Sequence, residues 1–247
     1  MYDAQSVPHA LDRVLTWLID SPIGGRRRVS PYVNWQTFSR LATGIACAFG
    51  RPIWGLNPAS TTLSCPIHPM RLYASNETTD RETRTALTPE TAEKLIRSGF
   101  EVTFESGLGA RADFPDAAYE AIGAQPLDRD TGLAQADVAL WVGPPELSAV
   151  HKMKRGALSA GFLDPFQRRD VLEAFVNQGV TGVSLEMMPR STLAQKMDAI
   201  SSQANIAGYM AVIVAAERLN RIFPMMMTPA GTLSPVKVFV IGIGVAG

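Results

Sequence analysis

Cysteine is scarce in this chain, and its scarcity excludes two classes of protein. Only Cys47 and Cys65 occur in 247 residues. Neither lies in the C-x-x-C spacing of a zinc site, and two cysteines provide no disulfide framework of the kind that stabilises small secreted domains. We therefore expect no metal site and a reducing compartment.

Net charge and long apolar runs are also lacking. Lys plus Arg total 23 and Asp plus Glu total 23, so nothing suggests nucleic acid as a partner. The apolar run that bears on a membrane, residues 207–216, is about half of the ~20 residues that a bilayer crossing requires. We expect a globular protein of one or two domains without a transmembrane segment.

Lysine and glutamate are missing altogether from residues 1–69. This stretch carries six Arg against three Asp and holds three of the four tryptophans, Trp17, Trp35 and Trp54. Three explanations are open: translation from a start codon upstream of the original one, an Arg-rich and acid-poor organelle transit peptide, or a small domain. We favour the first, in which Met70 is the original start.

After Met70, strands alternate with helices. Strands are expected over residues 71–75, 101–105, 137–142, 156–163 and 182–186. Helices between such strands cross over from one to the next, which makes the strands parallel and covers both faces of the sheet. The pattern predicts an α/β fold with a doubly wound parallel sheet of the Rossmann or flavodoxin type.

Two of the helices carry clear start and stop signals. Thr88 is a capping residue, Pro89 suits the first turn, and Gly99 marks the end. In the same way Asp164 is expected to open a second helix that Gly179 closes. Each helix fills the interval between two expected strands.

The regular alternation ends near residue 192. A helical run follows that is longer than a normal crossover and is expected to bridge two domains, and Pro and Gly then predict a β-hairpin. A short buried strand is expected over residues 237–241. The expected units are residues 1–69 of doubtful status, an N-terminal α/β lobe over 70–192, a bridging helix over 193–222, and the start of a second lobe over 223–247.

The last residues form a dinucleotide-binding motif. Gly242, Gly244 and Gly247 have the spacing G-x-G-x-x-G after the strand expected over 237–241, with Val245 between them. In such motifs the glycines allow a tight turn, and the pyrophosphate lies at the N-terminus of the helix that follows. We expect Gly242, Gly244, Val245 and Gly247 to contact a dinucleotide.

The most specific stretch is "MPRSTLAQKMDAISSQANIAGY", residues 188–209. It resembles the signature P-R-x-x-x-A-Q-x-M-D-x-L-S-S-x-A-N-x-A-G-Y of the alpha subunit of proton-translocating NAD(P) transhydrogenase, with Ile200 in place of Leu. Residues 70–109 and 234–247 also look like stretches of that subunit. The resemblance covers residues 70–247 and implies the front portion of a longer subunit, truncated at the fingerprint.

The signature contains the residues expected to carry function. Arg190 and Asp198 are expected to form a charge-assisted pair that fixes the loop between them, with Gln195 on its outer side. The resemblance implies that this loop holds the nicotinamide end of NAD(H) against NADP(H) on a partner subunit. It implies that Arg190 contacts the ribose and pyrophosphate and that Asp198 holds Arg190 and the carboxamide. It also implies that Gln195 contacts the facing nucleotide and that Ser201 makes a supporting hydrogen bond.

Three further positions of this loop are expected to contact the cofactor: Ser191, Thr192 and Leu193. The family often has a second Arg where this chain has Leu193, so one contact differs. Hydride passes directly between two nicotinamide rings in such an enzyme, so these residues position the rings and no general base is required.

The resemblance also implies partners and a location. The complete enzyme would move hydride from NADH to NADP⁺ while a membrane subunit moves protons, and the subunit to which this chain belongs would be a homodimer when complete. It would lie on the cytoplasmic side, peripheral to the inner or plasma membrane through its partner subunits. If residues 1–69 were a transit peptide, the location would be the mitochondrial matrix.

Two alternatives stay open. Alanine dehydrogenase shares this fold and binds its substrate through an Arg in the position of Arg84, a Lys and a His; here Trp141 stands where the Lys is expected, and residues 159–165 contain no His. The other alternative is a non-catalytic truncated remnant that at most associates with partner subunits, because the helix after the fingerprint would be missing.

Overall fold

The computed structural model describes Arg13, residues 69–192 and residues 194–247. The interpretation of residues 1–69 as the product of an upstream start therefore falls almost wholly outside the described residues. The expected cofactor contact at Leu193 also lies outside them.

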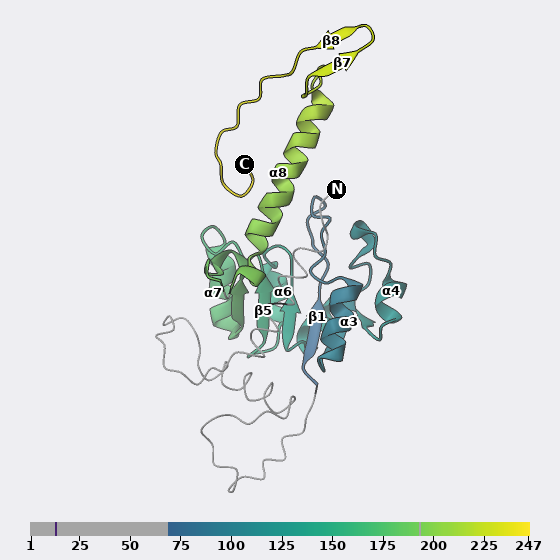
Figure 1. The fold of residues 1–247 in the computed structure, drawn as a ribbon. Coiled ribbons are helices and arrows are strands. Elements are labelled where there is room, and N and C mark those ends of the chain that lie inside the picture. The colour runs from purple at the N-terminus through teal and green to yellow at the C-terminus, as the bar shows by residue number, and fades with distance from the viewer. Residues whose placement is uncertain (1–12, 14–68, 193) are drawn as a thin grey trace.

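Six parallel strands form the sheet that the alternating pattern predicts (Figure 1). Their order across the sheet is β3-β2-β1-β4-β5-β6, the doubly wound order of Rossmann folds, so the predicted fold class is confirmed. The chain reverses its winding between β1 and β4, which places the topological switch point between these two strands. The strands are β1 (Arg71–Ala74), β2 (Glu101–Glu105), β3 (Gln125–Leu127), β4 (Val138–Leu140), β5 (Leu158–Gly161) and β6 (Thr181–Ser184).

Helices cover both faces of the sheet. Successive residues of a strand point to opposite faces, so each strand contributes side chains to two cores. Leu72 and Ala74 of β1 belong to the core on the face covered by α3 (Pro89–Arg97) and α4 (Asp116–Glu120). Tyr73 belongs to the core on the other face. That second face is covered by α5 (Arg129–Gln135), α6 (Leu147–Lys152) and α7 (Arg169–Gln178).

The start and stop signals of the helices are confirmed with one exception. Thr88 caps α3 by accepting a hydrogen bond from the Thr91 amide, and Gly179 ends α7 in the left-handed conformation with a φ of 72°. The predicted start of α7 at Asp164 is wrong. Asp164 has a φ of 47° and accepts backbone hydrogen bonds in a turn, so α7 begins only at Arg169.

The sequence prediction missed several short elements: β3, α4, α5, α6 and the 3₁₀ helices η1 (Ala110–Ala112) and η2 (Leu185–Met187). β3 contains Pro126, which cannot donate to a ladder and therefore suits the edge of a sheet. β3 pairs with β2, which is 22 positions earlier in the chain, so local periodicity does not reveal it.

The bridging helix and the hairpin are present. After a 3₁₀ turn, η3 (Gln195–Met197), helix α8 (Ala199–Arg218) leaves the sheet, and β7 (Met226–Thr228) pairs with β8 (Gly231–Leu233) at its far end (Figure 1). The helix is shorter at both ends than the run predicted over 193–222. Asp198 caps it at the start, and Leu219 ends it in an extended conformation.

The strand predicted over residues 237–241 is not formed. Phe239 is 88% exposed and Ile241 is 91% exposed, and the segment runs back along α8 without strand pairing (Figure 1). A strand requires a neighbour for its backbone groups, and none of the described residues provides a sheet edge beside this segment. A buried strand was therefore the wrong interpretation of this apolar run.

Candidate functional site

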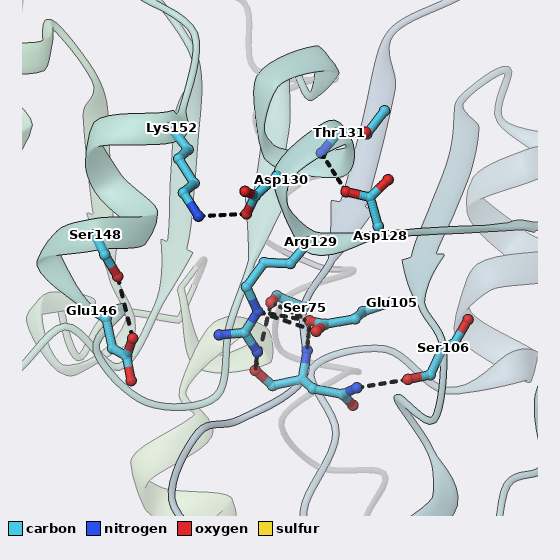
Figure 2. Close-up of polar contacts among 11 residues, drawn as sticks. Ser75, Glu105, Ser106, Asp128, Arg129, Asp130, Thr131, Glu146, Ser148 and Lys152 are labelled. Carbon is cyan, nitrogen blue, oxygen red and sulfur yellow. Dashed lines mark hydrogen bonds and ion pairs between the residues drawn. The ribbon is translucent and has the colours of Figure 1, made fainter.

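The carboxyl edge of the sheet is held together by carboxylates that reach from one strand end to the next. Glu105 at the end of β2 accepts hydrogen bonds from the Ser75 hydroxyl at 2.7 Å and from the Arg129 guanidinium at 3.1 Å (Figure 2). Arg129 also donates to the backbone oxygen of Asn76 at 2.8 Å. The loop after β1 is thereby fixed against β2 and the start of α5.

Glu77 makes the corresponding connection across the switch point. Its carboxylate accepts the Val142 amide at 2.6 Å and the Gly143 amide at 3.1 Å, both of which follow β4. Burial raises the pKa of the Glu77 carboxyl above its usual range, and the two amides oppose this shift because they favour the ionised form. The side chain thus joins the segments that follow β1 and β4 at the switch point, where open α/β sheets usually bind ligands.

Arg84 links the same loop to the bridging helix. It forms a bidentate pair with Glu82, at 2.7 Å and 2.6 Å, and donates to the Gln203 side chain on α8 at 3.1 Å. The guanidinium lowers the pKa of the Glu82 carboxyl although partial burial opposes that shift. This arginine, which a dehydrogenase would use for its substrate carboxylate, is already engaged by a carboxylate of its own chain.

Glu186 repeats the arrangement at the other end of the sheet. Its carboxylate accepts the Leu163 amide at 3.2 Å and the Asp164 amide at 2.7 Å, both after β5. The Ser184 hydroxyl also donates to it. The chain that leaves β6 is therefore fixed where the signature loop, residues 189–198, begins.

The signature loop combines buried anchors with exposed polar side chains. Ala194 is 3% exposed and Met197 is 4% exposed, and both pack into the main core. Backbone bonds from Ala194 and Gln195 to the Ser191 oxygen, at 3.1 and 2.9 Å, close the turn between them. The residues of the loop that are exposed are Pro189, Arg190, Ser191, Thr192, Gln195 and Lys196. The loop is held in place and presents its polar groups outward, as predicted for Gln195.

Asp198 is used differently from the prediction. Its carboxylate accepts the Ser201 amide at 2.9 Å and the Ser201 hydroxyl at 2.6 Å, which caps α8. These hydrogen bonds hold the pKa of Asp198 below its usual range, and the Arg190 charge lowers it further. Within the described residues no ion pair joins Arg190 to Asp198, so the predicted direct pair is wrong. The carboxylate instead satisfies free amides at the start of the helix, and Ser201 supports it as expected.

The capping role of Asp198 predicts how its substitution changes the free energy of unfolding. Asp198→Ala is expected to lower the free energy of unfolding by about 1 kcal/mol, whereas Asp198→Asn should cost little because Asn caps as well as Asp. Since the folded-state pKa is lowered, the contribution of the charge is present above the unfolded pKa and is lost as pH falls below about 4. Urea unfolding of both variants between pH 7 and pH 3 measures this. A loss for Asp198→Ala that does not shrink on acidification would contradict it.

The fingerprint glycines form a tight turn beside α8. Gly242 has a φ of 93°, and a Cβ on Gly247 would lie 2.2 Å from the Gly242 oxygen. The turn lies against the helix at Gly208, where an added Cβ would be 2.2 Å from the Ala246 oxygen. Gly208 is ten residues beyond Asp198, so this turn and the signature loop lie about 15 Å apart along the helix axis.

Trp141 shows why the position expected for a substrate-binding lysine offers no charge. The side chain is 3% exposed, and its indole nitrogen donates to the Ser159 hydroxyl at 3.1 Å in the core on the α5 face. No group of three metal-ligating side chains occurs among the residues that the structure describes. The site offers hydrogen-bond donors and acceptors but no cluster for metal chemistry.

Helix α8 is the element that bears on the expectation of no transmembrane segment. Over the described ranges it is the one helix long and apolar enough to cross a membrane, judged by length and composition alone, and almost none of it is buried. That evidence is weak, because long apolar helices of other kinds pass the same test. The apolar run counted from the sequence, residues 207–216, covers only part of the helix, mostly its C-terminal half.

Sequence reasoning missed the carboxylates Glu77, Glu105 and Glu186. Apart from Ser184, which is two positions from Glu186, their partners are backbone amides and side chains that follow other strands, between 22 and 66 positions away. One signal was available, since each residue lies at or just after the end of a strand. A carboxylate in that place is suited to accept amides from the neighbouring strand end.

Comparison with known proteins identifies the family. The family described as "Alanine dehydrogenase/PNT, N-terminal domain" matches residues 74–207, and its C-terminal domain counterpart matches residues 211–247. The chain is 41% identical over 186 residues to an NAD(P) transhydrogenase alpha-subunit protein of Rickettsia prowazekii, covering 72% of this chain and 48% of the relative. It is 30% identical over 182 residues to an alanine dehydrogenase of Mycobacterium tuberculosis, with the same coverage of 72% and 48%.

A solved structure supports the same relationship. The transhydrogenase of Sinorhizobium meliloti matches with a TM-score of 0.68 and 40% identity, covering 72% of this chain and 53% of that one. The chain thus spans about half the length of these relatives. On the match to the two domains, the chain belongs to the alanine dehydrogenase/PNT family, and it resembles the transhydrogenase alpha subunits within that family.

Proposed function

We propose that this chain supplies the NAD(H)-binding portion of a proton-translocating NAD(P) transhydrogenase, which transfers hydride between NADH and NADP⁺. The observation that carries the proposal is the signature loop. Its apolar residues Ala194 and Met197 are buried, while the polar residues of the signature face outward. A loop held in this way suits the precise placement of a ring against a second nucleotide.

The residues present fit a dinucleotide. Gly242 adopts the positive φ that a tight phosphate-binding turn requires, and the space around Gly244 is open where a phosphate would approach the backbone. The cofactor supplies the hydride chemistry when bound, and the protein supplies its orientation. In the proposal the turn at Gly242, Gly244, Val245 and Gly247 holds the pyrophosphate, and the signature loop holds the nicotinamide end.

Each loop residue has a positioning role in this proposal. Arg190 is exposed, so its guanidinium reaches the ribose and pyrophosphate, and Ser191 and Thr192 beside it donate hydrogen bonds to the cofactor. Gln195 faces the nucleotide of the partner. Asp198 acts through the cap of α8 and holds the end of the loop, together with Ser201.

An amino-acid dehydrogenase is the other activity in the family, and the site argues against it. Trp141 is buried in the core and hydrogen-bonded to Ser159, and Arg84 is paired with Glu82. Residues 159–165 contain no histidine. Such an enzyme must bind a substrate carboxylate and move a proton, and these positions provide neither group.

The proposal includes partners and a place in the cell. A subunit that holds NADP(H) would face the signature loop, a membrane subunit would move protons, and the complete protein would be a homodimer. The chain would be peripheral to the membrane on the cytoplasmic side, through these subunits.

A hybrid alpha subunit tests the proposal. Residues 70–247 replace the matching segment of the Rickettsia prowazekii subunit, and the hybrid is mixed with a partner subunit that holds NADP(H). Hydride transfer from NADH to the bound NADP⁺ is expected, with the unchanged subunit as the positive control. No alanine-dependent reduction of NAD⁺ is expected. Measurable oxidation of alanine, or NADH binding without any transfer, would overturn the assignment.

A further inference from the structure

The bridging helix α8 is attached to the first lobe over a short part of its length. Ala199 is the one buried residue among its twenty, and the helix extends away from the sheet (Figure 1). A helix of this length spans about 30 Å, so a small tilt at its base moves its far end by several ångströms. The contacts that tie its first turns to the lobe therefore set its direction.

Arg84 holds one of these first turns. Its guanidinium nitrogen Nη1 donates to the Gln203 side-chain oxygen at 3.1 Å. Because a guanidinium has donors only, the oxygen of the Gln203 amide and not its nitrogen must face Arg84. Gln203 lies about 6 Å along the helix axis from Ala199. The contact thus acts beyond the buried residue and limits tilting about it.

Arg84 is itself immobilised by its own loop. Glu82 accepts hydrogen bonds from Nε at 2.7 Å and from Nη2 at 2.6 Å, a fork that leaves Nη1 for Gln203. The side chains of Arg84 and Glu82 are only 23% and 20% exposed, so water competes little with the pair. Arg111 also donates to the backbone oxygens of Thr79 and Glu82, at 3.0 Å and 3.3 Å. The loop therefore presents Arg84 to the helix as a fixed group.

We propose that Arg84 is a positioning residue that sets the angle between α8 and the first lobe through Gln203. The fingerprint turn rests against α8 at Gly208, so this angle also sets the distance from that turn to the signature loop. Over the ~15 Å from Asp198 to Gly208, a tilt of about 4° displaces the turn by about 1 Å. The effect on the angle is independent of the proposed function, whereas its effect on hydride transfer rests on that function.

Distance measurement in the full chain tests the angle. Spin labels carried by unnatural amino acids at Glu120 on α4 and Glu217 on α8, both exposed, report the spread of lobe-to-helix distances in pulsed electron double resonance. Gln203→Leu removes the acceptor at similar volume and leaves Arg84 paired with Glu82. It should widen the distance distribution about twofold, because the length of the helix amplifies tilting at its base. Gln203→Glu keeps an acceptor oxygen, now charged, so its distribution should stay narrow.

Gln135→Leu is the matched control. Gln135 also accepts a hydrogen bond from an arginine Nη1 at 3.1 Å, that of Arg71 at the start of β1, and it has no contact with α8 in that pair. Its substitution should leave the distance distribution unchanged. Equal widths for Gln203→Leu and Gln135→Leu would overturn the proposal, and so would equal widening in Gln203→Leu and Gln203→Glu.

Hydride transfer in the hybrid subunit provides the second readout. At saturating NADH, Gln203→Leu is expected to slow transfer by about tenfold, because the fingerprint turn and the signature loop are no longer held in register. Gln203→Glu should transfer at close to the unchanged rate. A hybrid that transfers no hydride contradicts the proposed function, while the distance widths still test the role of Arg84. Unchanged transfer in Gln203→Leu despite a wider distribution would show that the angle does not position the cofactor.

Discussion

Gln195→Ala in the hybrid subunit is expected to slow hydride transfer by about 10²-fold. In the proposed function Gln195 faces the second nucleotide, and a displacement of about 1 Å between reacting groups costs that much. The side chain is exposed on a short turn whose neighbours Ala194 and Met197 provide the packing. The melting temperature should therefore stay unchanged, and so should the dissociation constant for NADH.

Lys196 provides a matched control for this prediction. It is the next residue on the same turn, it is exposed, and the signature leaves its position variable. Lys196→Ala should transfer hydride at a rate close to that of the unchanged hybrid. Stopped-flow measurement of the hydride-transfer rates of Gln195→Ala and Lys196→Ala tests the prediction. Equal rates for Gln195→Ala and Lys196→Ala would show that the loop does not place the rings.

Gly132→Ala is expected to destabilise the first lobe by about 1–3 kcal/mol. An added Cβ would lie 2.1 Å from a ring carbon of Tyr73, whose side chain is fully buried and cannot turn outward. The helix propensity of alanine exceeds that of glycine by about 1 kcal/mol, which the overlap outweighs. Equilibrium unfolding in urea measures the difference.

Controls identify Tyr73 as the cause. Gly244→Ala has open space around the new methyl group and should stay within about 0.5 kcal/mol of the original chain. Tyr73→Leu combined with Gly132→Ala should lose less free energy than the sum of the two single changes, because the smaller side chain makes room. Additive losses would refute the direct overlap. The Tyr73 hydroxyl has no hydrogen-bond partner among the described residues, so its removal leaves no polar group there unsatisfied.

Local sequence signals were sufficient where one segment carries all the information. The Thr88 side chain caps α3 by bonding an amide three residues later, and Gly179 ends α7 because glycine adopts the left-handed conformation easily. Both effects act within one helical turn, so both could be predicted from the local sequence. The order of alternating strands and helices likewise restricts the topology to few choices, of which the doubly wound sheet is one. The dense signature over 188–209 pointed to the family for the same reason.

The tertiary structure alone decided what depends on distant partners. The apolar run over 237–241 reads as a strand, but a strand forms only beside a neighbour, and its residues are exposed here. Asp198 was expected to pair with Arg190, yet the nearer amide and hydroxyl of Ser201 bind its carboxylate. Glu77 accepts hydrogen bonds from amides 65 and 66 positions away, so no local sequence pattern predicts this contact. Periodicity and capping are properties of neighbouring residues, whereas hydrogen bonds between strand ends arise only when the folded sheet brings those ends together.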